Sequence, residues 1–403
     1  MNKPERLYFL DWVRIIAFFI LILYHTGMYY VTWDWHVKSP FASGLLEPFM
    51  WLSSPWRLGL LFFVSGVASA FMLARTRAGA FIRQRSWRLL LPLAFGMLVV
   101  VPLQPYYEVV EKLGYGGSYA DFMKLYLTGY DGFCREDCLI LPTWNHLWFV
   151  AYLWVYTALL GIAALAGAGR IERCGERLGR LLSGWRAVLL PVAVLAIARI
   201  LLKARFESTH ALVDDFHNHA VYLTLFVAGV LLARQERFWQ TLRSLRWQAL
   251  ATALCCWAYL VWYHELADHD RHTALLMDSL RPAERILFAL CQWCAIVAAC
   301  GFAHRHLNKD GPTRRYLTLA VFPVYILHQT LTVTLAHNMK PLLLPPAVEG
   351  PVLVLLTLAL SFAGYEAVRR VALLRPFFGL GPTAASAAGA GAGIRRPAGP
   401  AVP

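Results

Sequence analysis

The chain has 403 residues, of which 58% are hydrophobic and only 15% charged, and its formal net charge is +14. A soluble domain carries about 25% charged residues. The composition therefore argues against a soluble enzyme and favours a protein with many membrane-spanning helices. No basic domain lies outside the apolar runs, so nucleic-acid binding is not expected despite the positive charge.

Ten apolar runs follow one another along the chain and are candidates for membrane spans. The sequence therefore predicts an all-α polytopic membrane protein, a bundle of about ten transmembrane helices. The run at 220–233 is short and its ends are poorly defined. The ten runs cover residues 8–30, 57–74, 87–106, 147–168, 186–202, 220–233, 247–263, 284–303, 316–336 and 351–368.

The distribution of basic residues predicts the orientation of the bundle. With the N-terminus in the cytoplasm, 25 Lys and Arg residues fall on cytoplasmic segments and 11 on outer segments, while Arg14 and Arg199 lie within spans. Loops rich in Lys and Arg stay in the cytoplasm. We therefore expect both termini to be cytoplasmic, in a multi-pass protein of a bacterial inner membrane. The net charge is then mainly a signal of topology.

The first apolar run contains three polar groups, Asp11, Arg14 and His25. On an α-helix Arg14 and His25 are separated by roughly 16 Å along the axis and by about 20° around it, with Asp11 about 40° away from His25. The three side chains thus share one stripe, which must face the bundle interior or a water-filled path. Asp11 can pair with and orient Arg14. His25 either hydrogen-bonds a neighbouring helix or abstracts a proton, because imidazole has a neutral form near pH 7.

Three arginines, Arg83, Arg85 and Arg88, precede the third run, and the last two share one helix face. They could be ordinary positive-inside charge. They could also clamp a phosphate, because guanidinium pairs with phosphate in a bidentate manner. A phosphate-bearing donor held there, extending past Arg14 toward His25, would suit a transmembrane acyltransferase that uses a coenzyme A thioester.

These residues resemble the signatures of the membrane acyltransferase 3 family. Arg14 and His25 form the family's R-x10-H pattern, and RSWR (Arg85 to Arg88) matches its cytoplasmic R-x-x-R pattern. LFFVSG (61–66) and HLWFV (146–150) resemble the family's motifs on its second and fourth helices. RLYFLDWVR, WHVKSP, VYILHQTLT and Tyr365-Glu366 are most similar to a branch associated with succinylation of periplasmic glucans.

The resemblance implies an acyltransferase 3-type transmembrane domain over residues 1–378 and assigns roles to its matching residues. His25 would be the general base, and Arg14, Arg85 and Arg88 would bind the coenzyme. The donor would be acyl-CoA, either succinyl-CoA or acetyl-CoA, without a metal. The acceptor would be a hydroxyl of a periplasmic or cell-surface glycan, and membrane lipid would surround the bundle. The sequence does not indicate an oligomeric state.

Further candidates for substrate binding lie near the outer level of the bundle. Asn145, His146 and Trp148 could donate hydrogen bonds to the oxyanion of acyl transfer. His36 could contact glycan or be a solvated loop histidine. His328 could line the donor path or serve packing in the ninth run. Glu366, near the inner end of the last run, could contact substrate or pair with Arg369 or Arg370.

Other polar segments give weaker signals. THALVDDFHNH and HELADHDRH are rich in His and Asp but match no zinc-site spacing, so no metal is expected. Cys134 and Cys138 could form a local disulfide if their loop is periplasmic. The segment 379–403 is rich in Ala, Gly and Pro, cannot form a core, and is expected to be a disordered cytoplasmic tail.

Two other functions are compatible with intramembrane polar residues. Asp11, Arg14 and His25 could relay protons in a proton-coupled transporter, although the internal repeats of many transporters are not evident. The protein could also be a non-catalytic component of glycan assembly. Acyl transfer that depends on His25 would favour an enzyme over both the transporter and the non-catalytic component.

Overall fold

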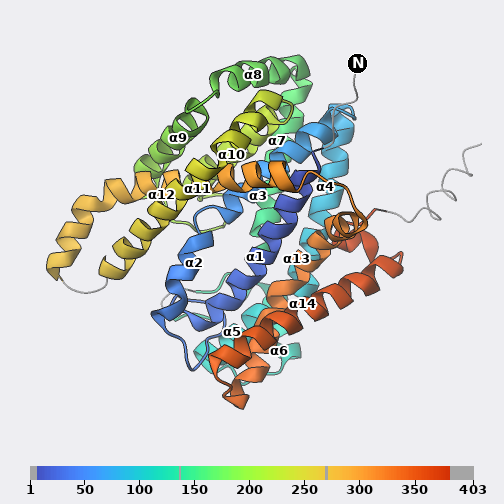
Figure 1. Cartoon of the computed structure of the whole chain (residues 1–403). Helices are drawn as coiled ribbons and strands as arrows, with labels where there is room; N and C mark the ends of the chain where they lie inside the picture. The colour runs from blue at the N-terminus through green and yellow to red at the C-terminus, as the bar shows by residue number, and fades with distance from the viewer. Residues whose placement is uncertain (1–6, 136–137, 268–270, 382–403) are drawn as a thin grey trace, which may run out of the picture.

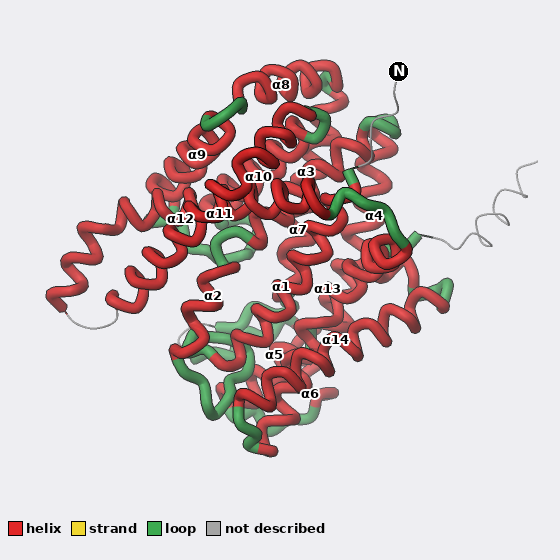
Figure 2. The backbone as a smooth tube through the Cα atoms, viewed as in Figure 1, coloured by secondary structure: helices red, strands yellow, loops and turns green. Residues whose placement is uncertain are grey.

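The computed structural model describes residues 7–135, 138–267 and 271–381, and this part of the chain is helical with no strand (Figures 1 and 2). The expected all-α architecture is therefore confirmed. The α-helices are α1 (Tyr8–Tyr30), α2 (Glu47–Ser53), α3 (Arg57–Leu73), α4 (Ala78–Phe95), α5 (Leu103–Leu113), α6 (Tyr119–Thr128), α7 (Trp148–Leu165), α8 (Ala168–Leu181), α9 (Arg186–Leu202), α10 (Phe216–Leu232), α11 (Glu236–Ala267), α12 (Arg271–His306), α13 (Pro312–Met339) and α14 (Pro346–Arg370).

Each of the ten apolar runs lies on a helical segment, but not every helix is long enough to cross a membrane alone. Within the described ranges, seven helical segments meet the length and hydropathy of a span, or nine if each of two bent pairs counts as one. The bends are 112° between α8 and α9 and 117° between α10 and α11. α9 and α10 have 17 residues each, a rise of roughly 26 Å against a hydrocarbon core of about 30 Å. The count of ten spans and the cytoplasmic termini stay predictions.

The first helix occupies the centre of the bundle. α1 packs against α3, α12, α13 and α14 (Figure 1). Its apolar side chains, such as Val13 and Phe18, are buried in the main hydrophobic core. Because Asp11, Arg14 and His25 all contact residues of α13, their stripe faces protein rather than lipid.

Two glycines allow α3 and α10 to cross closely. A Cβ atom at Gly66 would lie 2.0 Å from the carbonyl oxygen of Phe226, and one at Gly229 would lie 2.0 Å from that of Phe63. No side chain fits at either position. Small residues at a crossing let helix backbones approach in a membrane, where lipid tails provide no hydrophobic driving force. This crossing fixes the position of α3, which lines the candidate site.

The third apolar run is an interrupted helix. Pro92 lies inside α4, and a π-helical turn, Gly96–Val100, leads toward α5. A π-turn changes the backbone hydrogen-bond pattern, and the carbonyl oxygen of Val100 accepts a hydrogen bond of 3.0 Å from Thr330 Oγ1 of α13. The freed carbonyl is thereby satisfied by a neighbouring helix, as an apolar environment requires.

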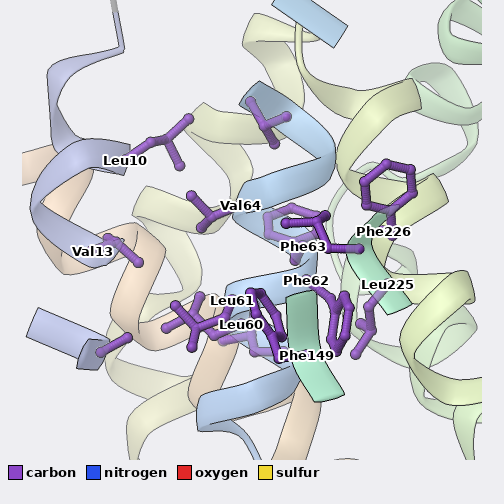
Figure 3. Close-up of a cluster of buried hydrophobic side chains, with 14 of the residues drawn as sticks. Leu10, Val13, Leu60, Leu61, Phe62, Phe63, Val64, Phe149, Leu225 and Phe226 are labelled. Atoms are coloured by element: carbon purple, nitrogen blue, oxygen red, sulfur yellow. The ribbon is translucent and has the colours of Figure 1, made fainter. Parts of the chain in front are cut away.

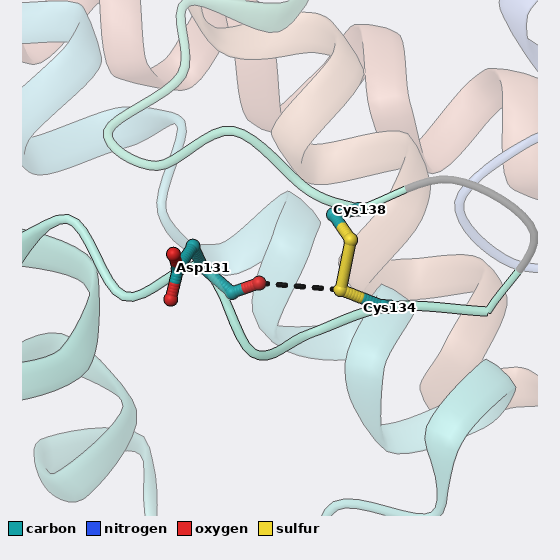
Figure 4. The surroundings of a disulfide bond; sticks show 3 residues. All are labelled: Asp131, Cys134 and Cys138. Carbon is teal, nitrogen blue, oxygen red and sulfur yellow. Dashed lines mark hydrogen bonds between the residues drawn. A yellow bond between two sulfur atoms is a disulfide. The ribbon is translucent and has the colours of Figure 1, made fainter.

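The loop between α6 and α7 contains the disulfide that the sequence allowed. Cys134 and Cys138 are bonded, and the sulfur of Cys134 lies 3.2 Å from the carbonyl oxygen of Asp131 (Figure 4). At the other end of the chain, Phe378 packs against Phe95 of α4 with ring centroids 5.4 Å apart. Most of the predicted tail, residues 382–403, lies outside the described residues.

Candidate active site

His25 faces a cavity of about 380 Å³ at one end of α1, which we call the His25 cavity. α1, α3, α13 and the segment leading into α7 supply most of its walls. Five of the residues predicted from sequence line it: His25, His36, Asn145, His146 and Trp148. The remaining lining residues are Leu21, Tyr24, Met28, Trp35, Arg57, Leu58, Leu61, Thr143, Trp144, Phe149, Thr209, His210, Tyr325 and Gln329.

His25 is oriented by a second histidine from α13. His25 Nδ1 lies 2.8 Å from His328 Nε2, and His328 Nδ1 lies 2.6 Å from the carbonyl oxygen of Tyr325. A carbonyl only accepts, so His328 Nδ1 must carry its hydrogen and Nε2 of the neutral ring must accept. His25 Nδ1 is then the donor, and Nε2 of neutral His25 keeps a lone pair. This is the tautomer that a general base needs.

The other predicted histidines belong to a buried hydrogen-bond network. His36 Nδ1 lies 2.5 Å from Glu108 Oε2, and its Nε2 lies 3.1 Å from the amide nitrogen of Gln329. His146 Nε2 lies 3.2 Å from the carbonyl oxygens of Tyr325 and Ile326. His146 therefore donates to the backbone of α13 and has no second N–H for the cavity.

The centre of this network is Gln104, which sequence reasoning missed. Gln104 is fully buried, and its oxygen accepts hydrogen bonds of 3.1 Å from Asn145 and 3.0 Å from Gln329. Its amide donates to Thr330 at 2.7 Å and to His146 Nδ1 at 3.3 Å. A fully satisfied buried network rigidifies its surroundings. A lone glutamine within the third apolar run was the available sequence signal.

Arg14 and Asp11 line a second cavity of about 480 Å³, the Arg14 cavity, between α1, α3 and the start of α4. Arg14 donates to the carbonyl oxygen of Thr318 at 3.3 Å, and its distance to Asp11 is 3.9 Å. Asp11 forms its shorter ion pair with Arg314 of α13, which is 2% exposed. Asp11 therefore joins α1 to α13, a partnership that neighbouring sequence positions could not reveal.

The remaining predicted residues lie beside the cavities rather than in them. Arg85 and Arg88 on α4 are close enough to Arg14 to interact with it electrostatically. Glu366 lies outside both cavities, where it accepts from Tyr316 at 2.9 Å and pairs with Arg369 and Arg370.

The two cavities lie at opposite ends of the polar stripe on α1, and α3 lines both. Arg14 lines one cavity, while Leu21 and His25 line the other. On α3, Val64 lines the Arg14 cavity and Leu61, one helical turn away, lines the His25 cavity. Figure 3 shows Leu61 and Val64 pointing toward α1. One turn of α3 and about two turns of α1, with mainly apolar side chains, therefore separate the residues that line the two cavities.

Within the described ranges, no group of three or more His, Cys, Asp and Glu side chains could hold a metal ion. Part of the HELADHDRH segment, residues 268–270, lies outside those ranges. The expectation that the protein needs no metal stays a prediction.

Replacing His328 with alanine should lower kcat by about 10- to 100-fold, because one hydrogen bond that orients His25 is lost. The Michaelis constant for the donor should change little, since His328 does not line either cavity. Steady-state kinetics of acyl transfer would check this. His337→Ala on the same helix, whose ring bonds Glu111 at 2.9 Å, is the control. Equal losses in both variants would contradict the positioning role.

Comparisons with known proteins identify the family of the chain. The family model described as an acyltransferase domain of the acyltransferase 3 type matches residues 7–366. The chain is 24% identical over 349 residues to glucans biosynthesis protein C from Escherichia coli O81 (strain ED1a) and from Escherichia coli (strain SE11). Each alignment covers 84% of this chain and 85% of the relative. No solved structure matches significantly. With a match across nearly all its described helices, the chain belongs to the acyltransferase 3 family.

Proposed function

We propose that this multi-pass membrane protein is an O-acyltransferase that transfers an acyl group from cytoplasmic acyl-CoA to a hydroxyl of a periplasmic or cell-surface glycan. Succinyl-CoA and acetyl-CoA are the candidate donors, and the inner membrane is the expected location. The name of the relatives, glucans biosynthesis protein C, supports a glucan as the acceptor, and we propose that this glucan is periplasmic.

The observation that carries the proposal is the placement of a potential base and a potential anion-binding group in two cavities along one helix. His25, with a lone pair on Nε2, lines one cavity, and Arg14 lines the other. The distribution of Lys and Arg in the sequence supports a cytoplasmic position for the Arg14 cavity. A donor entering there would reach His25 after passing the apolar side chains between the two cavities.

The chemistry follows from the tautomer of His25. Nε2 takes the proton of an acceptor hydroxyl as its oxygen attacks the thioester carbonyl carbon. The carbonyl electrons move onto the carbonyl oxygen, and collapse of this intermediate breaks the carbon–sulfur bond and releases the thiolate of coenzyme A. His25 becomes an imidazolium, and the Nδ1 hydrogen bond to His328 holds its ring in place during the transfer.

The proposed donor site can be tested by coenzyme binding. Acetyl-CoA or succinyl-CoA should raise the melting temperature of the purified protein. Arg85→Ala together with Arg88→Ala should weaken donor binding by about 10²–10⁴-fold, because two charge-assisted hydrogen bonds are lost and each contributes about 1.5–3 kcal/mol. Arg83→Ala, an exposed arginine on the same helix, is the matched control. Binding that is unaffected by the double substitution would remove the phosphate-clamp assignment.

The activity itself can be tested in cells by mass spectrometry of periplasmic and surface glycans, with and without the gene. A succinyl or acetyl adduct that requires the gene would identify donor and acceptor together. If the adducts are identical in both strains, the transferase proposal fails, and a transporter or a non-catalytic role becomes the better explanation.

A further inference from the structure

Arg57, the first residue of α3, is a buried arginine that sequence reasoning counted only as a helix-end charge. It is 5% exposed and lines the His25 cavity. Its Nε and Nη1 atoms are buried and have no hydrogen-bond partner. Two nitrogens of a guanidinium, which together carry three N–H groups, are therefore unsatisfied beside the candidate base.

The surroundings of Arg57 stabilise its charge incompletely. Its guanidinium carbon lies 3.3 Å from the centre of the Tyr24 ring, a cation–π contact. Within the described ranges no carboxylate pairs with it. By contrast Arg314, which is 2% exposed, pairs with Asp11 and Asp310. A buried charge without a counter-charge is costly, so an anion that enters the cavity would be bound favourably.

The position of Arg57 suits an anion formed next to His25. The Tyr24 and His25 rings are 6.1 Å apart, and this distance added to the 3.3 Å of the cation–π contact limits the separation of the guanidinium and the His25 ring to about 9 Å. His25 lies one turn beyond Leu21 on α1, and Arg57 lies one turn beyond Leu61 on α3. An acyl group passing these leucines therefore meets the two polar groups at the same depth.

Two of the donors that the sequence suggested for an oxyanion already have partners. Asn145 donates one of its two amide hydrogens to Gln104, and His146 donates to the backbone of α13. The indole N–H of Trp148 is neutral and the weaker partner for a full negative charge. Arg57 is thus the strongest hydrogen-bond donor available in the cavity.

We propose that Arg57 is a catalytic residue that stabilises the oxyanion formed when the acceptor oxygen attacks the thioester carbonyl. This inference rests on the proposed function. As the new carbon–oxygen bond forms, the carbonyl electrons become a negative charge on the carbonyl oxygen, and the unsatisfied N–H groups of Arg57 donate to it. Collapse returns those electrons to the carbonyl and expels the thiolate. Fixed donors need little reorganisation during this step.

The test is a comparison of Arg57→Gln and Arg57→Lys with the wild type, using acetyl-CoA, succinyl-CoA and a linear gluco-oligosaccharide acceptor. Arg57→Gln should lower kcat by about 10²–10³-fold with each donor that the wild type accepts. The Michaelis constant of that donor should stay within a few-fold, because the oxyanion exists only during the reaction. Arg57→Lys keeps a charge and should recover part of the loss.

Arg199→Gln is the matched control for removing a buried arginine. Arg199 is also 5% exposed and stacks on Phe288 at 3.5 Å, but it lies outside the His25 cavity. Its variant should keep wild-type kcat. Melting temperatures with and without the donor establish that each variant is folded and binds the coenzyme.

Several outcomes would overturn the assignment. A Michaelis constant that rises while kcat is unchanged, or a loss confined to succinyl-CoA, would show that Arg57 binds the substrate's own carboxylate instead. The oxyanion role would be excluded if Arg57→Gln kept the wild-type kcat. It would also be excluded if the kcat of Arg57→Lys were no higher than that of Arg57→Gln. No transfer by the wild type would instead contradict the proposed function itself.

Discussion

Replacing His25 with alanine is expected to lower kcat by about 10²–10⁴-fold, the usual contribution of a positioned general base. Its ring is half-buried in the His25 cavity, and Nδ1 is engaged by His328 at 2.8 Å. Alanine removes the lone pair without adding bulk or charge. Donor binding should persist, because the proposed coenzyme contacts lie at the other end of α1. Glycan mass spectrometry in cells and single-turnover transfer with purified protein would measure the loss.

His306→Ala is a suitable control for His25→Ala. His306 is exposed at the end of α12 and lies outside both cavities, so its variant should transfer acyl groups at the wild-type rate. Glycan acylation that persists in cells carrying folded His25→Ala protein would contradict the catalytic assignment. If His25→Ala also abolished the rise in melting temperature that the donor causes, the histidine would have a structural role instead.

The second large effect is expected at the crossing of α3 and α10. Gly66→Ala should destabilise the protein by at least about 1–3 kcal/mol, the usual cost of overpacking, because its Cβ would lie 2.0 Å from a backbone oxygen that cannot rotate away. Gly66→Val should prevent accumulation of folded protein. Thermal unfolding in detergent and the yield of monodisperse protein would record both effects.

The control for Gly66→Ala is Gly79→Ala on α4, where a Cβ would meet no atom within 4 Å. This change should be neutral or slightly stabilising, because alanine favours helix more than glycine does. An unchanged melting temperature for Gly66→Ala would contradict this prediction, because it would mean that α3 and α10 can move apart without loss of stability. Because α3 carries Arg57 and Leu61, a folded Gly66→Ala protein should also lose part of its transfer activity.

Helical periodicity predicted the polar stripe of α1 because Asp11, Arg14 and His25 lie on one element. Eleven residues are close to three whole turns, so the spacing alone indicates a shared face. The apolar runs likewise predicted helices at all ten places. The number of times that the chain crosses the membrane was harder to predict. α9 and α10 are short and join α8 and α11 at sharp bends, and hydropathy cannot detect such bends.

The partners of these residues could not be predicted, because they come from distant parts of the chain. Asp11 pairs with Arg314, and His25 bonds His328, each across about three hundred positions. Arg57 looked like any helix-end cation, since only the packed structure shows that it is buried and that none of the described carboxylates pairs with it. Residue type and spacing indicate which groups are costly in a membrane, while tertiary packing decides what each one contacts.

The apolar layer formed by Leu61 and Val64 of α3 and the middle of α1 also has a consequence for the cell's energy supply. If the two cavities opened to opposite sides of a membrane without such a layer, protons would leak and dissipate the gradient that drives ATP synthesis. Hydrocarbon side chains provide no hydrogen-bonded water chain along which protons could hop. The layer would therefore insulate the resting membrane electrically, and an acyl donor would have to displace its side chains to reach His25.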